Sequence, residues 1–232
     1  MELFFKFIPT WYCQRMRSSL ALHARRMLRH RSSLANVATT PPPDVVPILL
    51  LGHPQLLKTC APLFDGKSDI NAAIEEQAFI ARQLCATAAA HNSFGLAAPQ
   101  VGHMKRMFVV VRDWVEAQRT GSTSVEDYDI YIDPMMDISV GSFGNDNNTQ
   151  VNQERCLSIP GAYGMVTRHD SVRISYVDGN NIFGKQKQQR KPQRVLKKLA
   201  AFRSAIFQHE LDHLDGVLYL DRMDEEDEAV ED

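Results

Sequence analysis

The amino-acid sequence predicts an α+β fold, with antiparallel β-sheets around a central helix that carries an HExxH metal motif. The motif is QHELDH at positions 208–213, and it closes a stretch with helical periodicity. Apolar runs of strand length precede it, separated by turn-rich segments. One helix packed among antiparallel strands is an α+β arrangement, and residues 44–223 have a length typical of one domain.

Local patterns predict the elements of this domain. Residues 71–92 are predicted to form a helix, because apolar side chains recur at helical spacing from Ile74 to Ala88. The motif-bearing helix is predicted over residues 199–213, which include several alanines. Three apolar runs predict strands, Asp178-Gly179 predicts a hairpin turn, and two polar stretches predict surface loops. The strands are residues 107–111, 129–132 and 172–177, and the loops are residues 119–127 and 141–152.

Residues 1–43 predict a transit peptide followed by a proline-rich linker. The segment has seven basic residues, a single acidic residue and recurring serines and leucines, which is typical of a mitochondrial or, as the less favoured choice, a plastid transit peptide. An ordinary basic tail is the alternative. The apolar start, residues 3–8, is too short for a membrane span. At the other end, residues 224–232 form an acidic C-terminal tail.

The rest of the chain is acidic overall. Residues 1–43 hold seven of the 26 basic residues but only one of the 28 acidic residues. This balance argues against DNA and general nucleic-acid binding. One run of basic residues, from Lys185 to Lys198, is an exception to this acidic balance. A solvated hairpin insertion accounts for this run, and a contact with the RNA of an organellar ribosome is the alternative.

The HExxH motif predicts a hydrolytic metal centre. His209 and His213 are four residues apart, so both imidazoles project from one face of a helix and can bind one ion. Glu210 is then held beside the metal, where it can accept a proton from water. The alternative is a core helix with hydrogen-bonded histidines. The glutamate between two histidines at this spacing favours the metal site.

The third ligand decides the class of metallohydrolase. The extended zinc-protease pattern needs a histidine at position 219, where Tyr219 stands. The acidic tail has little apolar content to place a glutamate ligand from a later helix. None of the four cysteines forms a CxxC pair, and Cys60 and Cys85 are interpreted as small buried apolar residues. Cys156, which precedes a glycine-containing segment, is the better candidate.

Three segments in this order resemble the signature motifs of peptide deformylases: FGLAAPQVG at 94–102, ERCLS at 154–158 and QHELDHLDG at 208–216. Further agreement lies in GVLYLDRM at 216–223 and in Gly161, Gly164, Val166 and Arg168. The resemblance covers residues 47–223 and is strongest to the eukaryotic organellar type. It implies a hydrolase that removes the formyl group from formyl-methionyl nascent polypeptides of the organelle and releases formate.

The resemblance also implies one divalent metal per chain, held by Cys156, His209 and His213. Three protein ligands leave a fourth position open for chemistry. Fe²⁺ is the metal that the family typically holds, although Zn²⁺, Co²⁺ or Ni²⁺ suit the same donors.

Catalytic and substrate-binding roles follow from the resemblance in the same way. Glu210 would take a proton from water and return it to the leaving amine. Gln100 and the backbone N–H of Leu157 would donate to the oxygen that becomes negative. One and two turns before the first histidine, apolar side chains would line a pocket for methionine, although Phe202 could equally face the core. The expected substrate-binding residues are Gly95, Phe202, Ala205 and Ile206.

Two residues depart from the family pattern. Arg155 stands where a glycine usually precedes the metal-binding cysteine, and Ser93 replaces the first glycine of the first motif. If those backbones need a positive φ or a close approach to substrate, a side chain would cost about 1–3 kcal/mol or block binding. A catalytically weakened or inactive paralogue that binds metal and peptide is therefore one alternative function, and a metalloprotease is another.

Overall fold

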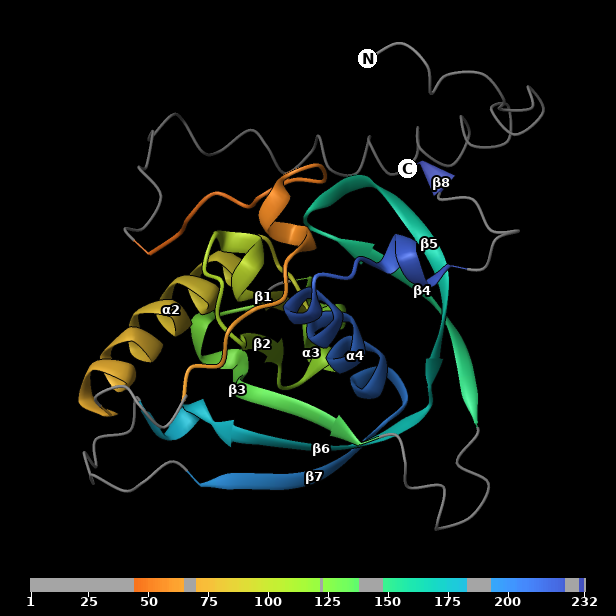
Figure 1. Ribbon diagram of the computed structural model, residues 1–232. Helices are drawn as coiled ribbons and strands as arrows, with labels where there is room; N and C mark the ends of the chain where they lie inside the picture. The colour runs from red at the N-terminus through yellow and green to blue at the C-terminus, as the bar shows by residue number, and fades with distance from the viewer. Residues whose placement is uncertain are drawn as a thin grey trace, which may run out of the picture. The chain divides into compact units, whose positions relative to one another are not determined.

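Two antiparallel sheets surround helix α4 (Ala201–Asp215), which confirms the predicted fold class (Figure 1). The computed structural model describes residues 44–64, 70–121, 123–137, 148–182, 193–223 and 230–231, all within the unit Pro42–Asp232. Several predicted segments lie outside these residues. They are the transit peptide with its linker, residues 141–147 of the second loop, residues 185–192 of the basic run, and residues 224–229 of the acidic tail.

The larger sheet has five strands in the order β1-β2-β3-β6-β7, and every neighbouring pair is antiparallel. The strands are β1 (Gly95–Ala97), β2 (Met107–Val111), β3 (Tyr128–Asp137), β6 (Ser171–Asp178) and β7 (Arg194–Ala200). The pairing of β3 with β6 shifts register between Ile132 and Met135. Strands β1 and β7 are the two edges, so β1 presents one unpaired side next to α4.

The smaller sheet has the order β4-β5-β8, with β4 (Thr149–Cys156), β5 (Ile159–His169) and β8 (Val230–Glu231). None of these three strands was predicted from the sequence. In β4, for example, polar residues point to both faces, so the strand lacks the apolar–polar alternation of a half-buried strand. Residues 149–152, predicted as loop, belong to β4. The inward-facing residues of its C-terminal half are Glu154 and Cys156, both buried, whereas Arg155 between them is exposed.

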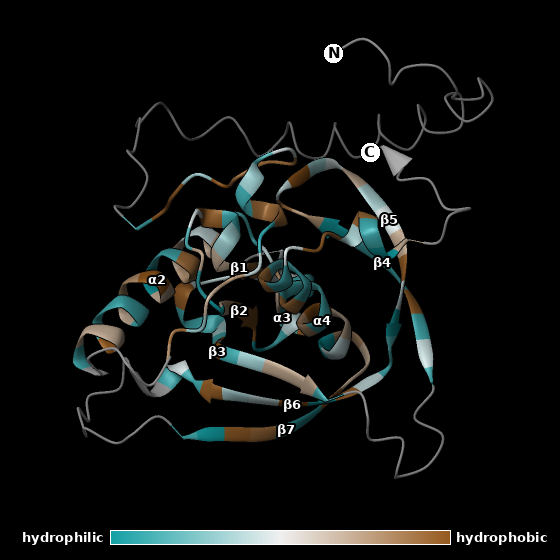
Figure 2. Cartoon of the chain, in the orientation of Figure 1, coloured by the Kyte–Doolittle hydropathy of each residue, from teal (hydrophilic) through white to brown (hydrophobic). Residues whose placement is uncertain are grey.

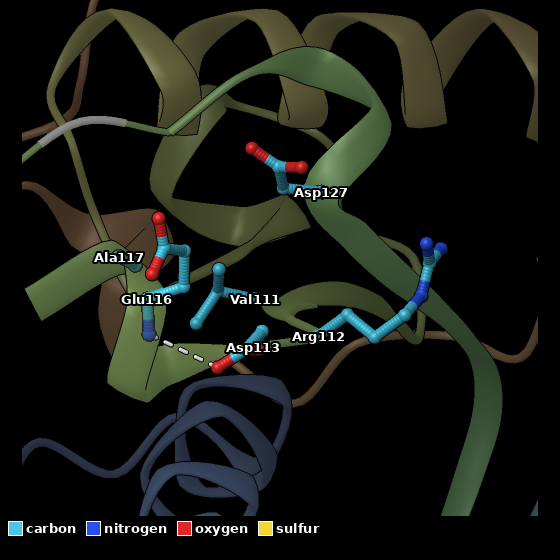
Figure 3. A pocket seen from close by; sticks show the side chains of 6 residues that line it. All are labelled: Val111, Arg112, Asp113, Glu116, Ala117 and Asp127. Atoms are coloured by element: carbon cyan, nitrogen blue, oxygen red, sulfur yellow. Dashed lines mark hydrogen bonds between the residues drawn. The ribbon is translucent and has the colours of Figure 1, made fainter. Parts of the chain in front are cut away.

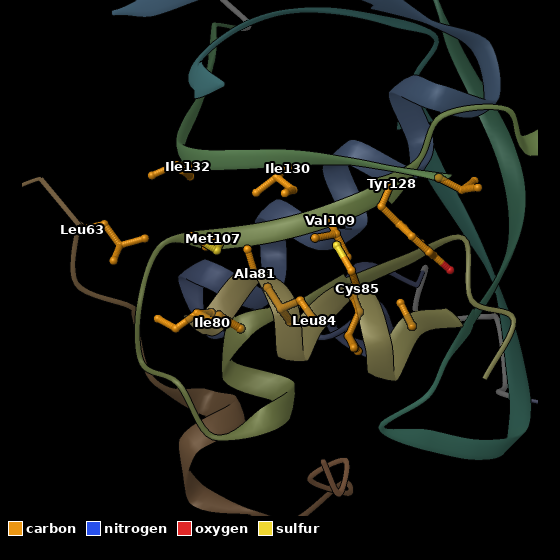
Figure 4. Close-up of a cluster of buried hydrophobic side chains, with 14 of the residues drawn as sticks. Leu63, Ile80, Ala81, Leu84, Cys85, Met107, Val109, Tyr128, Ile130 and Ile132 are labelled. Carbon is orange, nitrogen blue, oxygen red and sulfur yellow. The ribbon is translucent and has the colours of Figure 1, made fainter. Parts of the chain in front are cut away.

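Both faces of β2 are covered. Met107, Val109 and Val111 pack with α2 (Ile70–Ala90) in one hydrophobic cluster, as Figure 4 shows for Met107 and Val109. The intervening Phe108 and Val110 pack with α4 in a second cluster. Successive side chains of a strand point to opposite faces, so an all-apolar strand is buried on both sides. Figure 2 shows β2 as hydrophobic, between the two helices.

Several predicted boundaries are confirmed and others are wrong. Helix α2 and strand β2 agree with prediction. The predicted loop at 119–127 contains the end of helix α3 (Trp114–Thr120) and a 3-10 helix, Val125–Asp127. Asp178-Gly179 is not a hairpin turn, because a 3-10 helix (Gly179–Ile182) follows directly and β7 begins only at Arg194.

The central helix begins later than predicted. Leu199 lies in β7 and packs in the second cluster, and the helix starts at Ala201, whose φ is +51°. Three further 3-10 helices flank the site in the described chain: Pro54–Leu57 and Ala98–Val101 precede the central helix, and Tyr219–Arg222 follows it. No described helix is long and apolar enough to cross a membrane.

Candidate metal centre and active site

Helix α4 presents both predicted histidines to the smaller sheet. His209 and His213 lie one turn apart with their ring centroids 5.0 Å from each other. The helix ends directly after them at Gly216, whose φ of +75° and N–H bonds to the Asp212 and His213 carbonyls form a left-handed cap. The predicted ligand pair therefore occupies the last two turns of a helix whose end is fixed.

Cys156 comes from the end of β4, where the pairing with β5 shifts register. Its Sγ lies 3.2 Å from Nε2 of His213. One donor atom each from Cys156, His209 and His213 all fall within 4.8 Å of one another. The structure thus brings together the three predicted ligands, of which Cys156 is far from the histidines in the sequence.

This donor set fits a divalent metal. In a tetrahedral site with metal–sulfur and metal–nitrogen bonds of ordinary length, the donor atoms would be about 3.5 Å apart, close to the observed thiol–imidazole separation. Among the described residues, Glu210 Oε2 and His213 Nδ1 are buried side-chain atoms without a hydrogen-bond partner. Buried polar atoms are normally satisfied. The unpartnered Glu210 Oε2 therefore fits a site that receives a bound group, whereas His213 Nδ1 lies on the side of the ring opposite to the Nε2 that faces Cys156.

A buried ionic network holds the first histidine. Glu154 Oε2 lies 2.7 Å from Nδ1 of His209, which leaves Nε2 of that ring for the metal. Arg168 donates to both carboxylate oxygens of Glu154 and also binds Asp212. Asp212 in turn accepts from Arg222. No role was predicted for this network, although Glu154 and Cys156 lie two residues apart on one face of β4.

The local electrostatics suit a cation. Burial disfavours the charged form of His209, but hydrogen bonds to Cys156 and Glu154 outweigh burial and raise its pKa well above the usual value. Burial and the charges of His209 and Arg168 hold the pKa of His213 well below the usual value. Burial likewise opposes ionisation of Glu154, yet bonds from His209 and Arg168 lower its pKa to about 2. The Glu154 carboxylate that favours a charged His209 imidazole would equally favour a metal ion bound to that ring.

Glu210 faces β1 rather than the smaller sheet. The Cα of Gly95 lies so close to the Glu210 carboxylate that a Cβ on residue 95 would collide with Oε1. Burial raises the pKa of Glu210 to about 7, a value suited to proton transfer near neutral pH. The requirement for glycine at position 95 therefore has a steric cause, which is the approach of this carboxylate.

Gln100 reaches the same centre from the 3-10 helix Ala98–Val101. Its Oε1 accepts from the backbone N–H of Ala97 at 2.8 Å, and the amide nitrogen is turned toward the candidate ligand Cys156. Nε2 donates to Cys156 Sγ at 3.3 Å and to Ser158 Oγ at 3.1 Å. Leu157 lies between those two residues in the turn that links β4 and β5. Both predicted oxyanion donors thus lie next to Cys156.

The predicted pocket residues divide between the core and a half-buried aromatic group. Ala205 and Ile206 are buried on α4, and Ile206 belongs to the second hydrophobic cluster. Phe202 is half-buried and packs against Trp114 of α3 at 4.6 Å and edge-on to Phe94 at 5.5 Å. Trp114 was not among the predicted site residues, because its contact with Phe202 joins two helices that are far apart in the sequence.

Neither departure from the family pattern has strained backbone. The non-glycine residues with positive φ in the described chain are Asn92, Asp133 and Ala201, so Arg155 and Ser93 have ordinary backbone. Arg155 lies exposed on β4 with its guanidinium 5.1 Å from the centre of the Tyr163 ring. The expected cost of a side chain at these positions therefore does not arise from backbone conformation.

A separate pocket of about 200 Å³ lies where β2 meets α3 (Figure 3). It shares no residue with the metal centre. Asp113 in its wall caps α3 by accepting from the Glu116 N–H. The residues that line it are Val111, Arg112, Asp113, Glu116, Ala117 and Asp127.

Two imidazoles and a thiol around one point, with a buried carboxylate and an amide donor beside them, define a metal-dependent hydrolase. The model of the polypeptide deformylase family matches residues 45–229. This chain belongs to the peptide deformylase family, whose members are metal-dependent hydrolases that remove the N-formyl group from nascent peptides. The chain is therefore assigned to the deformylases and not to the metalloproteases, which were the alternative class.

Relatives in sequence and structure agree. Peptide deformylase 2 of Nostoc sp. is 32% identical over 182 residues, which cover 78% of this chain and 88% of the relative. The peptide deformylase of Thermomicrobium roseum is 36% identical over 171 residues, covering 68% and 83%. A peptide deformylase from Synechococcus elongatus, solved in complex with actinonin, superposes with a TM-score of 0.56 at 28% identity, covering 84% of this chain and 86% of that one.

Proposed function

We propose that this chain is a catalytically active deformylase of formyl-methionyl peptides, not an impaired paralogue. The observation that carries the proposal is the convergence of Cys156, His209 and His213 on one point, with Glu210 and Gln100 beside it. The ordinary backbone of Arg155 and Ser93 supports the same conclusion, because neither residue distorts the segment that bears it.

Cys156, His209 and His213 would hold the metal, and we propose Fe²⁺ as the ion in the cell. A bound divalent ion would supply Lewis acidity toward the formyl oxygen and the attacking water. A thiolate with two imidazoles also accepts Zn²⁺, Co²⁺ or Ni²⁺. Metal analysis of protein purified without oxygen tests the choice: iron at about one ion per chain supports it, and zinc alone overturns it.

The side chains of this chain divide the remaining steps between them. Glu210 accepts a proton from the attacking water and delivers it to the amine as the formamide C–N bond breaks, which yields formate and a free N-terminus. Gln100 Nε2 and the Leu157 N–H donate to the oxygen that becomes negative. The Ala97 N–H keeps the Gln100 amide in the orientation that this role needs.

We propose that the peptide lies along the free edge of β1. That edge faces away from β2 and carries Gly95, which directly adjoins the Glu210 carboxylate. An extended chain can add to an exposed sheet edge through main-chain hydrogen bonds. Phe202 with Phe94 and Trp114 offers apolar surface two helical turns from His209, about 10 Å along α4, where a methionine side chain could pack.

Formate release from formyl-Met-Ala-Ser by the full-length, iron-loaded chain tests the activity. Glu210→Gln is the matched control, since it keeps the shape of the side chain and removes the proton acceptor. Turnover by the wild type with loss of at least about 100-fold in the variant supports the proposal. Absence of turnover in protein that holds its metal overturns it.

A second variant separates an intact enzyme from an impaired one. Arg155→Gly restores the residue that the family usually has before the metal-binding cysteine. Because Arg155 is exposed and unstrained, we expect kcat/KM to change by less than about threefold, within the range of surface substitutions. A gain of a hundredfold would instead identify a natively impaired site.

We propose that the enzyme acts in mitochondria, with plastids as the second choice. The composition of residues 1–43 supports this. The full chain with a C-terminal fluorescent tag should enter the organelle, and deletion of residues 1–43 should leave it in the cytosol. Equal distribution of both forms would contradict the proposal.

A contact with the organellar ribosome would suit an enzyme of nascent chains. Arg194, Lys197 and Lys198 lie exposed on the edge strand β7, beside the exposed Leu196. Basic side chains along one strand can neutralise phosphates in a salt-dependent manner. Reversal of Lys197 and Lys198 to Glu should reduce co-sedimentation with ribosomes, and unchanged co-sedimentation would refute the contact.

A further inference from the structure

We propose that Ser93 tunes peptide affinity by occupying the outward carbonyl of Gly95, an acceptor that an extended substrate would use. The inference rests on the proposed placement of the peptide along β1. Ser93 Oγ donates to the Gly95 carbonyl oxygen at 2.6 Å. This is a short O–H···O hydrogen bond.

The register of β1 and β2 shows which way that carbonyl points. Gly95 opposes Val110, and Leu96 opposes Val109. One position earlier, Phe94 opposes Val111 and accepts its N–H at 2.7 Å. In an antiparallel pair, hydrogen-bonded and non-hydrogen-bonded positions alternate. Gly95 is therefore a non-hydrogen-bonded position, and its N–H and C=O point away from β2.

The other outward position of β1 supports this assignment. Ala97 is two residues after Gly95 and shares its orientation. Its N–H donates to the Gln100 side chain, outside the sheet, as an outward group should. The free edge of β1 thus has one position engaged by a catalytic side chain and one, Gly95, engaged by the Ser93 hydroxyl.

Ser93 is held firmly in place for this contact. Its backbone N–H donates to the Ala88 carbonyl at the end of α2, at 2.9 Å. Its own carbonyl accepts from the Tyr128 hydroxyl at 2.6 Å. With its backbone bonded on both sides, Ser93 keeps its hydroxyl within reach of the Gly95 carbonyl.

The affected carbonyl lies at the reacting end of the site. Gly95 is the residue whose Cα adjoins the Glu210 carboxylate. A peptide N–H approaching the Gly95 carbonyl must share it with Ser93 Oγ or displace that hydroxyl. A glycine at position 93 would impose no such competition. Ser93 would therefore weaken binding of the peptide backbone while leaving the catalytic groups in place.

The test compares Ser93→Ala, Ser93→Thr and wild type as full-length, metal-loaded protein. One net hydrogen bond corresponds to about a two- to tenfold change in an equilibrium constant. We expect Ser93→Ala to lower KM for formyl-Met-Ala-Ser and Kd for the product Met-Ala-Ser by about that factor, with a smaller effect on kcat. Ser93→Thr retains the hydroxyl and should restore the wild-type KM.

Ser124→Ala is the matched control, since the Ser124 hydroxyl donates to Asp127 within the same exposed turn rather than to a residue of β1. An unchanged or raised Kd in Ser93→Ala, measured by calorimetry, would overturn the inference. A wild type that binds Met-Ala-Ser yet releases no formate would overturn the proposed activity instead. The Kd comparison would still decide the role of Ser93, so the two failures are distinguishable.

Discussion

The Glu154 carboxylate lies 2.7 Å from Nδ1 of His209 and is itself bound through both oxygens by Arg168. A strand residue thereby fixes the rotation of a ring that belongs to the helix. Because Glu154 and Cys156 share one face of β4, the same strand carries one candidate ligand and orients another. Ligand geometry thus depends on the position of β4 against α4.

Exchange of Glu154 for Gln should weaken metal binding. The amide keeps the size of the side chain but loses the charge that orients and polarises His209, and loss of such a partner typically costs about 10- to 100-fold in metal affinity. Competition with a chelator measures the affinity at a temperature where the variant is folded. Glu116→Gln, in an exposed pair with Arg119, is the control. Equal affinities would contradict the role of Glu154.

Gly95→Ala should impair catalysis without removing the metal. The added Cβ would meet the Glu210 carboxylate, and a displacement of about 1 Å in a catalytic group can cost about 100-fold in rate. No metal ligand needs to move, so metal content should equal that of the wild type. A variant with normal kcat/KM would contradict this prediction, since it would show that β1 and α4 can move apart enough to accommodate the methyl group.

Gly216→Ala should be more destabilising than Gly121→Ala. Both glycines cap helices with positive φ, so alanine costs about 1–2 kcal/mol at either position. At Gly216 the Cβ would also meet the Leu57–Lys58 backbone, whereas at Gly121 it meets nothing within 4 Å. Urea unfolding should give a clearly larger loss of unfolding free energy for Gly216→Ala. Equal losses would show that the contact with the Leu57–Lys58 backbone adds no destabilisation.

Cys60 and Cys85 should resist alkylation in the folded protein. Burial raises the pKa of the Cys60 thiol to about 11 and of the Cys85 thiol to about 12, and the thiolate is the reactive form. Iodoacetamide at pH 8 should leave both unmodified until urea is added, as peptide mass spectrometry can show. Modification at the rate of an exposed thiol would contradict the packing of α2 and of the segment around Cys60.

Asp129 should stabilise the fold at neutral pH and lose this contribution to the free energy of unfolding at acidic pH. Burial opposes its ionisation, but hydrogen bonds from Arg112 and Arg203 outweigh burial and hold its pKa below the usual value. A depressed folded-state pKa stabilises the fold above the unfolded-state pKa of about 3.9, and that stability is lost as pH falls below it. Asp129→Asn should cost about 2 kcal/mol at pH 7 and progressively less toward pH 3. A pH-independent difference would refute this.

The sequence was sufficient to predict those parts of the site that lie in one helix or one motif. His209, Glu210 and His213 are close in sequence, and helical geometry alone places them together. The all-apolar β2 was equally recognisable. Cys156 could be named as a candidate ligand, but its distance from His213 follows only from the fold, because β4 lacks the apolar alternation that marks a half-buried strand.

The supporting contacts were not predictable, because they join residues from different elements. Arg168 lies on β5, Asp212 on α4 and Glu154 on β4, and each alone looks like a surface charge. The helix α3 was missed because it is short and follows a strand directly. The concern about Arg155 and Ser93 depended on backbone angles, which the order of residues does not reveal.

Cys156 and the two histidines belong to separate parts of the fold, the end of a strand in the smaller sheet and the last turns of the central helix. A bound ion would tie these parts together like a cross-link, so cofactor supply and protein lifetime become linked. At free metal 100 times above Kd, such binding adds about 2.7 kcal/mol to stability. Chains that fail to acquire metal in the cell would then be removed by proteolysis sooner than those that are loaded.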